Sequence, residues 1–395
     1  MISVGEALGL LFELCRPLQT ETLPLRRAAG RVLRAPVEAK RDQPPFAASA
    51  MDGYAIIETD HRPGAVLDVI GQAAAGAGFQ GRLRPGEAVR IFTGAPVPEG
   101  AERVVLQEDV TRAADRITLA HALEASANIR AAGQDFRRGD TIPAPRALSP
   151  SDLALIAAMN QPSVSVTRKP VVAIMATGDE LVMPGESPGP DQIIASNSFA
   201  LAAMAEAAGA EVRMLPIARD NEPALRFAFD LARGADLVVT IGGASVGDHD
   251  LVGPVAQKLG LERSFYKIAM RPGKPLMAGR LGESVFLGLP GNPVSSIVCG
   301  HIFMLPMLRV MLGLPVAPAP ALQGRLAVPV GENGPRAHYM RAASERREGT
   351  VWLTPSTRQD SALLSVLASS DALLIRPPHD PARAQGDPVD FVPLR

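Results

Sequence analysis

Between residues 169 and 315, short apolar runs alternate with longer stretches of helical periodicity. The apolar runs are rich in β-branched residues, which predicts buried strands. They are Val171–Met175, Val212–Ile217, Leu237–Ile241, Ser264–Met270 and Val285–Leu289. Strands that alternate with helices at this spacing predict a doubly wound, parallel-sheet α/β domain. In such a fold, ligands bind in the crevice at the carboxyl ends of the strands.

The pattern differs on both sides of this segment. The apolar positions of residues 1–16 fit one face of a helix, and Ser3 followed by Glu6 predicts a capping box at its start. Residues 54–129 carry short β-like runs between glycines and prolines, which is typical of a small all-β domain. A linker rich in proline and alanine follows residue 314, and short β-like runs return after it.

These changes of pattern predict a multidomain α/β protein. We expect a discontinuous α+β N-terminal domain, an all-β insert, the α/β domain and a C-terminal β domain. Their expected bounds are 1–45 with 130–168, 46–129, 169–315 and 319–395, respectively. Ser149 before Pro150 predicts the start of a helix in the second part of the N-terminal domain. Arg31–Ala39 is expected to form one strand of its first part.

Composition narrows the class of protein. An apolar fraction of 47% over 395 residues is enough for several hydrophobic cores. A net charge of −1 gives no general field that would attract nucleic acid or an anionic membrane. Two cysteines, Cys15 and Cys299, exclude a disulfide framework and a multi-cysteine zinc site. The sequence shows no N-terminal signal peptide and no apolar run of about 20 residues, so we expect a cytoplasmic protein outside the membrane.

The loop after Leu237–Ile241 carries the densest candidate chemistry. It reads GGASVGDHD over Gly242–Asp250, so glycines that let successive N–H groups face an anion are followed at once by Asp248 and Asp250. Carboxylates beside a phosphate need a divalent cation between them. This pattern therefore favours Mg²⁺ with a phosphorylated ligand. A plain strand-to-helix loop with a solvated acidic tip is the alternative.

Other unusual loops follow the neighbouring strands. They are Thr177–Glu180, Asp220, Arg271–Pro275 and Pro290–Ser296. Because the carboxyl ends of parallel strands meet at one edge of a sheet, these loops should converge with Gly242–Asp250. Convergence of five such loops favours a ligand site over a plain connection.

The charges on this edge are mixed in sign. Glu180 and Asp220 are acidic, whereas Lys267, Arg271 and Lys274 are basic. Asn292 and Ser295 stand near a helix N-terminus, which is a natural anion site. We therefore expect a phosphorylated ligand with Mg²⁺ on the acidic side and a second oxyanion on the basic side.

Two features outside the α/β domain have two interpretations each. Asp52-Gly53 is typical of a hairpin turn, or it presents a carboxylate at a domain boundary, where clefts form. Gln359-Asp360-Ser361 precedes a helical stretch near Ala362–Ala368, and an N-cap is its simplest role.

Six motifs occur in an order that identifies a family. They are SAMDGYA (Ser49–Ala55), FTGAPVP (Phe92–Pro98), TGDEL (Thr177–Leu181), GGASVGDHD (Gly242–Asp250), RPGKP (Arg271–Pro275) and GLPGNPVS (Gly288–Ser295). With these motifs the chain resembles the molybdopterin molybdenumtransferases, which are the MoeA-type bacterial enzymes and the corresponding domain of gephyrin. The resemblance runs over nearly the whole chain.

The resemblance implies a homodimer whose active cleft is shared between the two subunits. It implies that molybdate is transferred to the dithiolene of adenylylated molybdopterin, with Mg²⁺-assisted release of AMP. The dithiolene sulfurs belong to the substrate, which fits a chain with only two cysteines. A molybdopterin adenylyltransferase and molybdoenzyme maturation proteins are the implied partners.

The resemblance also implies a role for each matching position. The expected catalytic residues are Asp52, Thr93, Asp135, Glu180, Asp220, Asp250, Lys267 and Lys274. The expected Mg²⁺ ligands are Glu180, Asp220 and Asp250. The expected substrate-binding residues are Gly242, Gly243, Ser245, Asp248, Arg271, Pro290, Asn292, Pro293, Ser295, Arg341 and Ser361.

The chain departs from the family pattern at two positions. Arg271 replaces the first lysine of the KPGKP pattern, and Asp360 precedes Ser361 where glycine is usual. Arginine keeps the charge but presents a wider fork. An aspartate beside Ser361 could repel molybdate.

Two alternatives to the insertase interpretation stay open at this point. A molybdopterin adenylyltransferase shares the α/β domain and its glycine loop, whereas the SAMDGYA segment and the terminal β domain are foreign to that class. A non-catalytic molybdopterin-binding scaffold would have no need of the charged loops. The motifs do not distinguish molybdate from tungstate.

Overall fold

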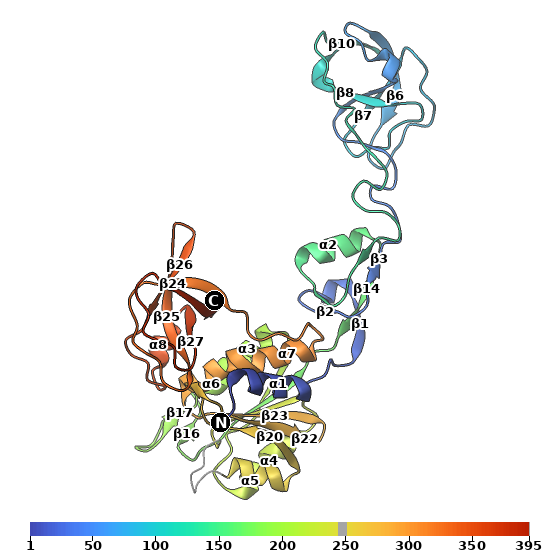
Figure 1. Ribbon diagram of the computed structural model, residues 1–395. Coiled ribbons are helices and arrows are strands. Elements are labelled where there is room, and N and C mark those ends of the chain that lie inside the picture. The colour runs from blue at the N-terminus through green and yellow to red at the C-terminus, as the bar shows by residue number, and fades with distance from the viewer. Residues whose placement is uncertain (244–250, 395) are drawn as a thin grey trace.

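The computed structural model describes residues 1–243 and 251–394. The chain forms an elongated, bent molecule in which the α/β domain lies at the bend (Figure 1). The C-terminal domain rises on one side of the bend. The N-terminal domain leads away on the other side and carries the β insert at the far end. The insert is therefore remote from the α/β domain of its own chain.

The α/β domain is built on a six-stranded sheet in the order β18-β15-β19-β23-β22-β20. In chain order, the strands are β15 (Val171–Ala176), β18 (Glu211–Met214), β19 (Leu237–Ile241), β20 (Leu261–Tyr266), β22 (Met277–Leu281) and β23 (Ser284–Leu289). The helices are α3 (Asn197–Ala207), α4 (Glu222–Leu231), α5 (Val252–Lys258), α6 (Pro293–Cys299) and α7 (Leu305–Met311). A short parallel pair, β16 (Leu181–Val182) and β17 (Ile193–Ile194), follows β15.

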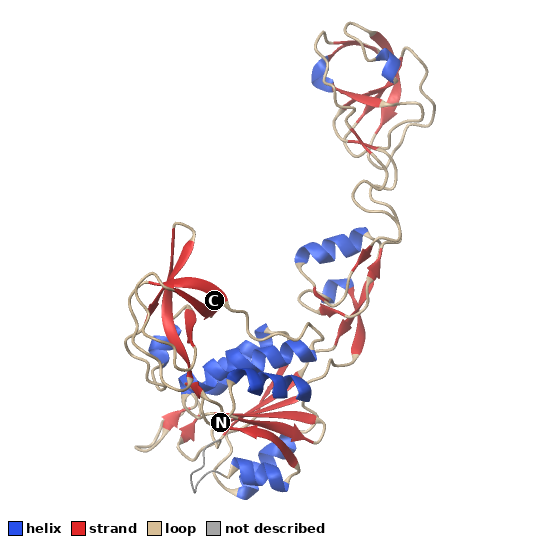
Figure 2. Cartoon of the chain, in the orientation of Figure 1, coloured by secondary structure: helices blue, strands red, loops and turns tan. Residues whose placement is uncertain are grey.

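Alternating residues of the central strands explain why helices cover both faces of the sheet (Figure 2). Val172 and Ile174 of β15 pack with the helices α3, α6 and α7, whereas Ala173 and Met175 pack with α4 and α5. Strands buried on both faces read as continuous apolar runs, which is the pattern seen in the sequence.

The predicted doubly wound α/β domain is confirmed, but its sheet is mixed, because one edge is antiparallel. β18, β15, β19 and β23 are parallel, but β22 pairs antiparallel with both β20 and β23. The connection from β20 to β22 is too short to hold a crossover helix, so these strands can only form a hairpin. The expected strand Ser264–Met270 also ends at Tyr266, and Met270–Arg271 forms a separate strand, β21.

Helix α1 (Val4–Leu14) has the predicted capping box, in which Ser3 and Glu6 exchange hydrogen bonds of 3.1 and 2.7 Å. It differs from the expected domain of residues 1–45 in where it packs. Its buried face, Ala7, Leu8 and Leu11, joins the core of the α/β domain. An amphipathic helix can bury its apolar face against any complementary apolar surface. The local sequence pattern therefore does not specify the domain on which the helix packs.

The N-terminal domain joins two segments of the chain in one small sheet, of order β1-β14-β2-β13, and in one core. Its strands are β1 (Thr20–Pro24), β2 (Val32–Leu33), β3 (Val37–Glu38), β12 (Thr141–Ile142), β13 (Arg146–Ala147) and β14 (Ser163–Thr167). The expected single strand Arg31–Ala39 is thus two short strands, β2 and β3, in different sheets. Helix α2 (Pro150–Ala158) begins as predicted, with Ser149 as N-cap and Pro150 in its first turn.

The insert is a six-stranded sheet of order β8-β5-β7-β6-β10-β9. Its strands are β5 (Gly53–Ile56), β6 (Val66–Ala73), β7 (Glu87–Ile91), β8 (Arg103–Leu106), β9 (Val110–Ala113) and β10 (Arg116–Leu119), and the pair β4 (Ala48–Ser49) and β11 (Ile129–Arg130) closes its base. Two small clusters of buried apolar side chains stabilise it.

The C-terminal domain is a closed barrel, because β25 pairs with both β26 and β27 in a sheet of order β21-β25-β26-β24-β28-β27. Its strands are β24 (Leu322–Leu326), β25 (Ala337–Arg347), β26 (Thr350–Pro355), β27 (Ala372–Arg376) and β28 (Pro388–Pro393), with helix α8 (Leu364–Ala368) between β26 and β27. β21 of the α/β domain adds to this barrel, which aligns Arg271 with His338.

The segment Pro293–Met311 is long and apolar enough to cross a membrane, but 83% of its most apolar window is buried inside the protein. It comprises α6, a π-helical turn (Gly300–Met304) and α7. Its side chains fill the core between α1, α3 and the sheet, which accounts for its composition as a core helix.

Candidate active site

A cavity of about 730 Å³ opens at the carboxyl ends of β15, β19 and β23. Four of the five predicted loops supply about half of its lining, with Thr177, Glu180, Asp220, Gly242, Gly243 and Pro290–Pro293 among the lining residues. The fifth loop contributes only Pro275. The predicted edge is therefore the site of a real cavity, although its basic loop is mostly elsewhere.

Glu180 and Asp220 bring two carboxylates to the same cavity. The Glu180 carboxylate folds back over Gly178, where the positive φ of 145° favours glycine and a Cβ atom would overlap the carboxylate. Within the described residues, no group of three His, Cys, Asp or Glu side chains has a metal-binding arrangement. Asp250, the third expected Mg²⁺ ligand, lies outside the described residues, as do Ser245 and Asp248. The magnesium site stays a prediction.

The backbone conformation and the close contacts at positions 242 and 243 require glycine at both. Their φ values of 93° and 63° belong to the left-handed region. A Cβ atom on Gly242 would lie 2.9 Å from the Thr177 carbonyl oxygen, and one on Gly243 would overlap the Val252 side chain. The backbone thus approaches the floor of the cavity closely, as an anion-binding loop must.

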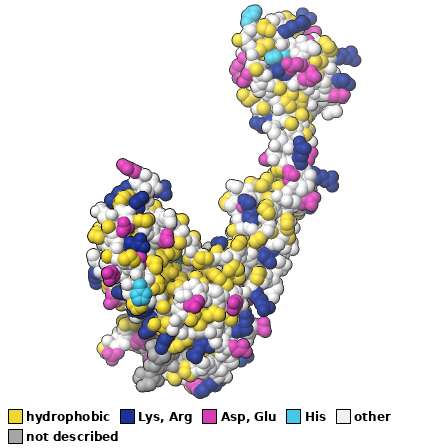
Figure 3. Space-filling view, in the orientation of Figure 1, with side chains coloured by type: hydrophobic (Ala, Val, Ile, Leu, Met, Phe, Trp, Pro, Cys, Tyr) yellow, Lys and Arg dark blue, Asp and Glu magenta, His cyan; other side chains and the backbone are white. Residues whose placement is uncertain are grey.

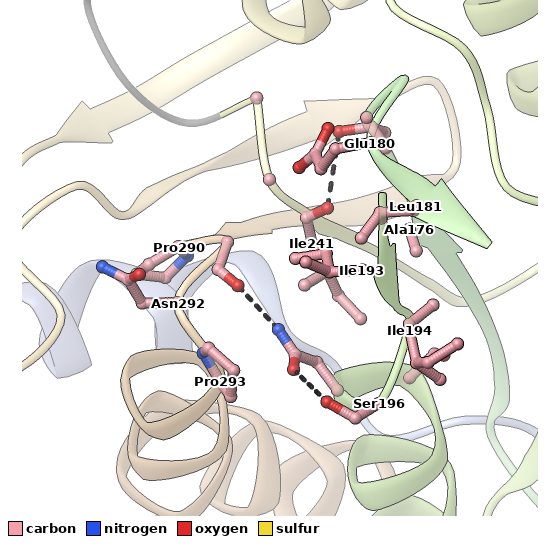
Figure 4. Close-up of a pocket in the computed structure, with 18 of the residues that line it drawn as sticks. Ala176, Glu180, Leu181, Ile193, Ile194, Ser196, Ile241, Pro290, Asn292 and Pro293 are labelled. Atoms are coloured by element: carbon pink, nitrogen blue, oxygen red, sulfur yellow. Dashed lines mark hydrogen bonds between the residues drawn. The ribbon is translucent and has the colours of Figure 1, made fainter. Parts of the chain in front are cut away.

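The opposite wall is formed by Pro290, Gly291, Asn292 and Pro293 at the start of α6 (Figure 4). It is fixed by Asn197, whose Nδ2 donates a hydrogen bond of 2.7 Å to the Gly291 carbonyl oxygen. The Ser196 hydroxyl donates to Asn197 Oδ1 at 3.1 Å. Sequence reasoning did not assign Asn197 to the site, because nothing local distinguishes it from a helix-capping asparagine.

Arg341 is the most deeply buried charged side chain near this wall, with 1% of its surface exposed. Its Nη1 donates to the Asp360 carbonyl oxygen at 2.8 Å and its Nε to Gln359 Oε1 at 3.3 Å. Within residues 1–243 and 251–394, no carboxylate forms an ion pair with it. Burial lowers the pKa of Arg341, and the Asp360 charge opposes that shift. A buried guanidinium that meets mainly neutral acceptors favours an added anion.

The turn that follows Gln359 and Asp360, the two hydrogen-bond partners of Arg341, reaches the cavity. Asp360 Oδ1 accepts a hydrogen bond of 2.8 Å from Ala362 N, and the Ser361 carbonyl oxygen accepts one of 3.1 Å from Val294 N in α6. Ala362 lines the cavity. The N-cap interpretation of Asp360 is wrong, because α8 starts at Leu364 and has no side-chain cap. Instead, Gln359 and Asp360 position Arg341.

The residues predicted to bind the second oxyanion, which are Lys267, Arg271, Lys274 and Ser295, do not lie together in the structure. Arg271 lines a second cavity of about 520 Å³ with His338, Gln359, Asp360 and Arg376, on the barrel side of β21. The Lys267 ammonium lies 4.9 Å from the centre of the Tyr266 ring, and Lys274 is exposed. Ser295 is buried beneath the start of α6. None of these four residues is among the described residues that line the first cavity, and their roles in substrate binding stay predictions.

His338 lies in an unusually basic environment. Burial lowers its pKa to about 4, and Arg271, Arg341, Arg376 and Arg336 add to the effect by repelling a second positive charge. His301, in the π-helical turn, has its pKa lowered to about 4 by burial alone. Both imidazoles are therefore neutral in the folded protein at neutral pH.

The lowered pKa values of His301 and His338 predict that the folded protein loses stability in mild acid. The unfolded chain binds a proton at each imidazole below about pH 6.5, whereas the folded chain does not until about pH 4. Their contribution to stability is complete above pH 6.5 and declines as pH falls toward 4, with a loss of about 2 kcal/mol for each histidine at pH 5. Urea unfolding at pH 7.5 and 5.0 should show a smaller difference for His301→Gln/His338→Gln than for the unsubstituted protein. An unchanged difference would contradict the prediction, and exposed His121→Gln is the control.

Asp52 and Thr93 lie together in the insert. The Asp52 carboxylate accepts two hydrogen bonds of 2.7 Å, from Thr93 N and Thr93 Oγ1, and these bonds lower the pKa of Asp52. The hairpin interpretation of Asp52-Gly53 is wrong, since β4 and β5 do not pair with each other. Gly53 instead permits a close approach to the Val105 carbonyl, which a Cβ atom would overlap.

The structure does not bring these insert residues to the cavity of the same chain. Asp52 and Thr93 belong to the insert, which lies at the far end of the molecule (Figure 1). Exposed Asp135 lies in the segment between β11 of the insert and β12 of the N-terminal domain. The predicted site residues thus form separate groups: the cavity with Glu180 and Asp220, the Arg341 corner, the Arg271 cavity, and the Asp52–Thr93 pair.

Comparison with known proteins gives consistent matches along the chain. Residues 2–160 match the family described as MoeA N-terminal region (domain I and II), residues 173–310 match a probable molybdopterin binding domain, and residues 323–394 match the MoeA C-terminal region (domain IV). The molybdopterin molybdenumtransferase of Haemophilus influenzae is 38% identical over 317 residues, covering 79% of this chain and 78% of that protein. The protein of the same name from Nostoc sp. is 37% identical and covers 80% and 75%.

A solved structure has the same architecture. The molybdopterin biosynthesis MoeA protein from Pyrococcus horikoshii superimposes with a TM-score of 0.83 at 26% identity, covering 99% of both chains. The similarity includes the insert and the barrel, so it extends well beyond the α/β domain.

Proposed function

Because this chain belongs to the MoeA family of molybdopterin molybdenumtransferases, and so is a transferase of molybdenum cofactor biosynthesis, we propose that its cavity at the sheet edge binds adenylylated molybdopterin. Molybdate is transferred to the dithiolene of this substrate and AMP leaves. The observation that carries the proposal is the cavity at the carboxyl ends of the strands, where the Glu180 and Asp220 side chains meet the backbone of Gly242 and Gly243.

In this proposal, the basic and the acidic residues bind different parts of the reacting system. Arg341 supplies a fixed cation for the incoming oxyanion, and its planar fork suits the oxygens of a tetrahedral dianion. The backbone at Gly242 and Gly243 supports the phosphate part of the substrate. Glu180 and Asp220, on the acidic side, fit a hard divalent cation such as Mg²⁺, whose donors are carboxylate oxygens. Bound there, Mg²⁺ would neutralise phosphate charge during the release of AMP.

The test is AMP release from adenylylated molybdopterin by the purified protein with Mg²⁺, in the presence and absence of molybdate. Release that requires molybdate supports the insertase. An adenylate that binds and stays intact with molybdate would contradict the proposal. Formation of adenylate from ATP and molybdopterin would indicate an adenylyltransferase, and binding without either reaction would indicate a scaffold.

We further propose that the active form is a homodimer in which the insert of one subunit completes the cavity of the other. The hollow between the two arms of the chain is lined by many apolar side chains (Figure 3). An apolar cavity of about 390 Å³ in this region is lined by residues such as Leu305, Pro306 and Leu314. A second copy in the hollow would cover apolar surface and would bring a second Asp52–Thr93 pair toward the cavity.

Subunit mixing tests the shared cleft. Asp52→Ala and Glu180→Gln should each be inactive alone, because each removes one half of every cleft. When the two variants are mixed and allowed to exchange subunits, the mixed dimers contain one intact cleft. AMP release should then recover to about one quarter of the unsubstituted rate. A mixture that remains inactive although its subunits exchange, as shown by differently tagged chains, would contradict the shared cleft.

The remaining expectations are consistent with this function. A cytoplasmic enzyme would receive its substrate from a molybdopterin adenylyltransferase and pass its product to molybdoenzyme maturation proteins. Co-purification of the protein with either partner is the direct check.

A further inference from the structure

An apolar flap borders the active-site cavity. It consists of β16 and β17, which pair in parallel through Leu181 with Ile193 and Val182 with Ile194. The backbone is well anchored, since Ile193 N donates to the Glu180 carbonyl oxygen at 2.7 Å and Ala195 N to that of Val182 at 2.9 Å. The flap is thus held beside the Glu180 carboxylate by backbone hydrogen bonds that do not depend on the isoleucine side chains.

The two isoleucine side chains of the flap are exposed although they are large and apolar. Ile193 has 58% and Ile194 has 39% of its surface exposed, and both line the cavity. One exposed apolar residue is ordinary on a protein surface. Two adjacent ones that border a cavity lined by carboxylates and by a glycine loop form an apolar contact surface.

The other side of the cavity carries a matching apolar wall. In Figure 4, Ile193, Ile194 and Leu181 lie on the side of the cavity opposite Pro290 and Pro293. The Asn197 amide fixes that wall through its hydrogen bond to the Gly291 carbonyl. The space between the two walls offers apolar contact on two sides, and Glu180 and Asn292 supply polar groups at its margin. A flat ring with polar edges fits this arrangement, whereas a phosphate or a bare oxyanion would find no donors on the isoleucines.

We propose that Ile193 and Ile194 form the contact surface for a planar nitrogen heterocycle, one of the two ring systems of adenylylated molybdopterin. The inference rests on the proposed function and deepens it, because it assigns a part of the substrate to a part of the cavity. β-branched side chains have few rotamers, so they present a rigid surface at little cost in conformational entropy. The adenine of the AMP part and the pterin share the chemistry that this surface recognises, and binding experiments distinguish them.

The test uses Ile193→Ser/Ile194→Ser in the full-length protein, with AMP and molybdopterin as separate probes in equilibrium binding. Removing two branched apolar side chains from contact with one ring should raise the Kd of one probe about tenfold and leave the other within about twofold. A weaker affinity for AMP alone assigns adenine to the flap, and a weaker affinity for molybdopterin alone assigns the pterin. Val316→Ser, at an exposed valine that does not line the cavity, is the matched control.

Two results would overturn the inference. One is unchanged affinity of the double variant for both probes. The other is a change in oligomeric state without a change in binding, which would make the isoleucines a subunit contact. Failure of the inference is distinct from failure of the proposed function. If the unsubstituted protein releases AMP in response to molybdate while the double variant binds both probes normally, only the flap assignment falls. If the unsubstituted protein binds neither probe, both the proposed function and the flap assignment are wrong.

Discussion

Glu180→Gln should reduce molybdate-dependent AMP release at least about 100-fold. The substitution keeps the shape of the side chain and its place over Gly178, but it removes the negative charge that faces the cavity. A neutral amide holds a hard divalent cation poorly, so charge on the departing phosphate would go unneutralised. The expected effect lies mainly in the rate at saturating substrate, and raising Mg²⁺ should recover part of it.

The measurement is single-turnover AMP release at several Mg²⁺ concentrations. Glu186→Gln provides the control, since this carboxylate lies in the loop between β16 and β17, accepts a hydrogen bond of 2.8 Å from Met183 N and does not line the cavity. It should leave the rate almost unchanged. A Glu180→Gln variant that works within about threefold of the unsubstituted rate would remove Glu180 from the mechanism.

Arg341→Met should separate function from stability. Loss of the buried cation should weaken the apparent affinity for molybdate at least about 100-fold, because a charge-assisted contact to a dianion is lost in a site that excludes water. Methionine fits the buried volume without a desolvation cost, and Gln359 Oε1 keeps its hydrogen bond of 3.1 Å from the Arg341 main-chain N–H. Thermal stability should therefore be unchanged or higher, because removing the buried guanidinium also removes the cost of taking its charge out of water.

The measurements are the molybdate dependence of AMP release and the thermal unfolding midpoint. Arg358→Met, at an exposed arginine of the same segment, should change neither. A large drop in thermal stability combined with an unchanged molybdate dependence would show that Arg341 has a structural role only. Arg376 offers the contrast, since its ion pair with Asp380 is buried. Arg376→Met should destabilise the barrel, because the buried Asp380 carboxylate loses one of its two arginine partners and keeps only Arg383.

The two predictions concern residues that the sequence presented very differently. Glu180 follows a continuous apolar strand in an α/β alternation, and strand direction alone places it at the ligand edge. Arg341 occurs within an alternating β segment whose partner strands are far away in the sequence. Its burial and its lack of a carboxylate depend on β21, β27 and the 359–362 turn, none of which local pattern specifies.

The sequence by itself determined the local elements and the family. Periodicity located β15, β19 and β23 almost to the residue, and the Ser3–Glu6 and Ser149–Pro150 signals located two helix starts, because capping and strand burial depend on a few adjacent residues. Motif order identified the family because it is a property of the chain alone. The cavity edge followed from strand direction.

Only the tertiary structure decided which groups meet. It packed α1 onto the α/β domain and made β20 and β22 an antiparallel edge. It also placed Arg271 in the lining of the barrel-side cavity and buried Arg341 against Gln359 and Asp360. It also placed the insert, which carries Asp52 and Thr93, far from the α/β domain, which carries Glu180. The reason is that local sequence shows which apolar faces and charges must be buried or paired. Which groups pair with them depends on packing between segments that are far apart in the sequence.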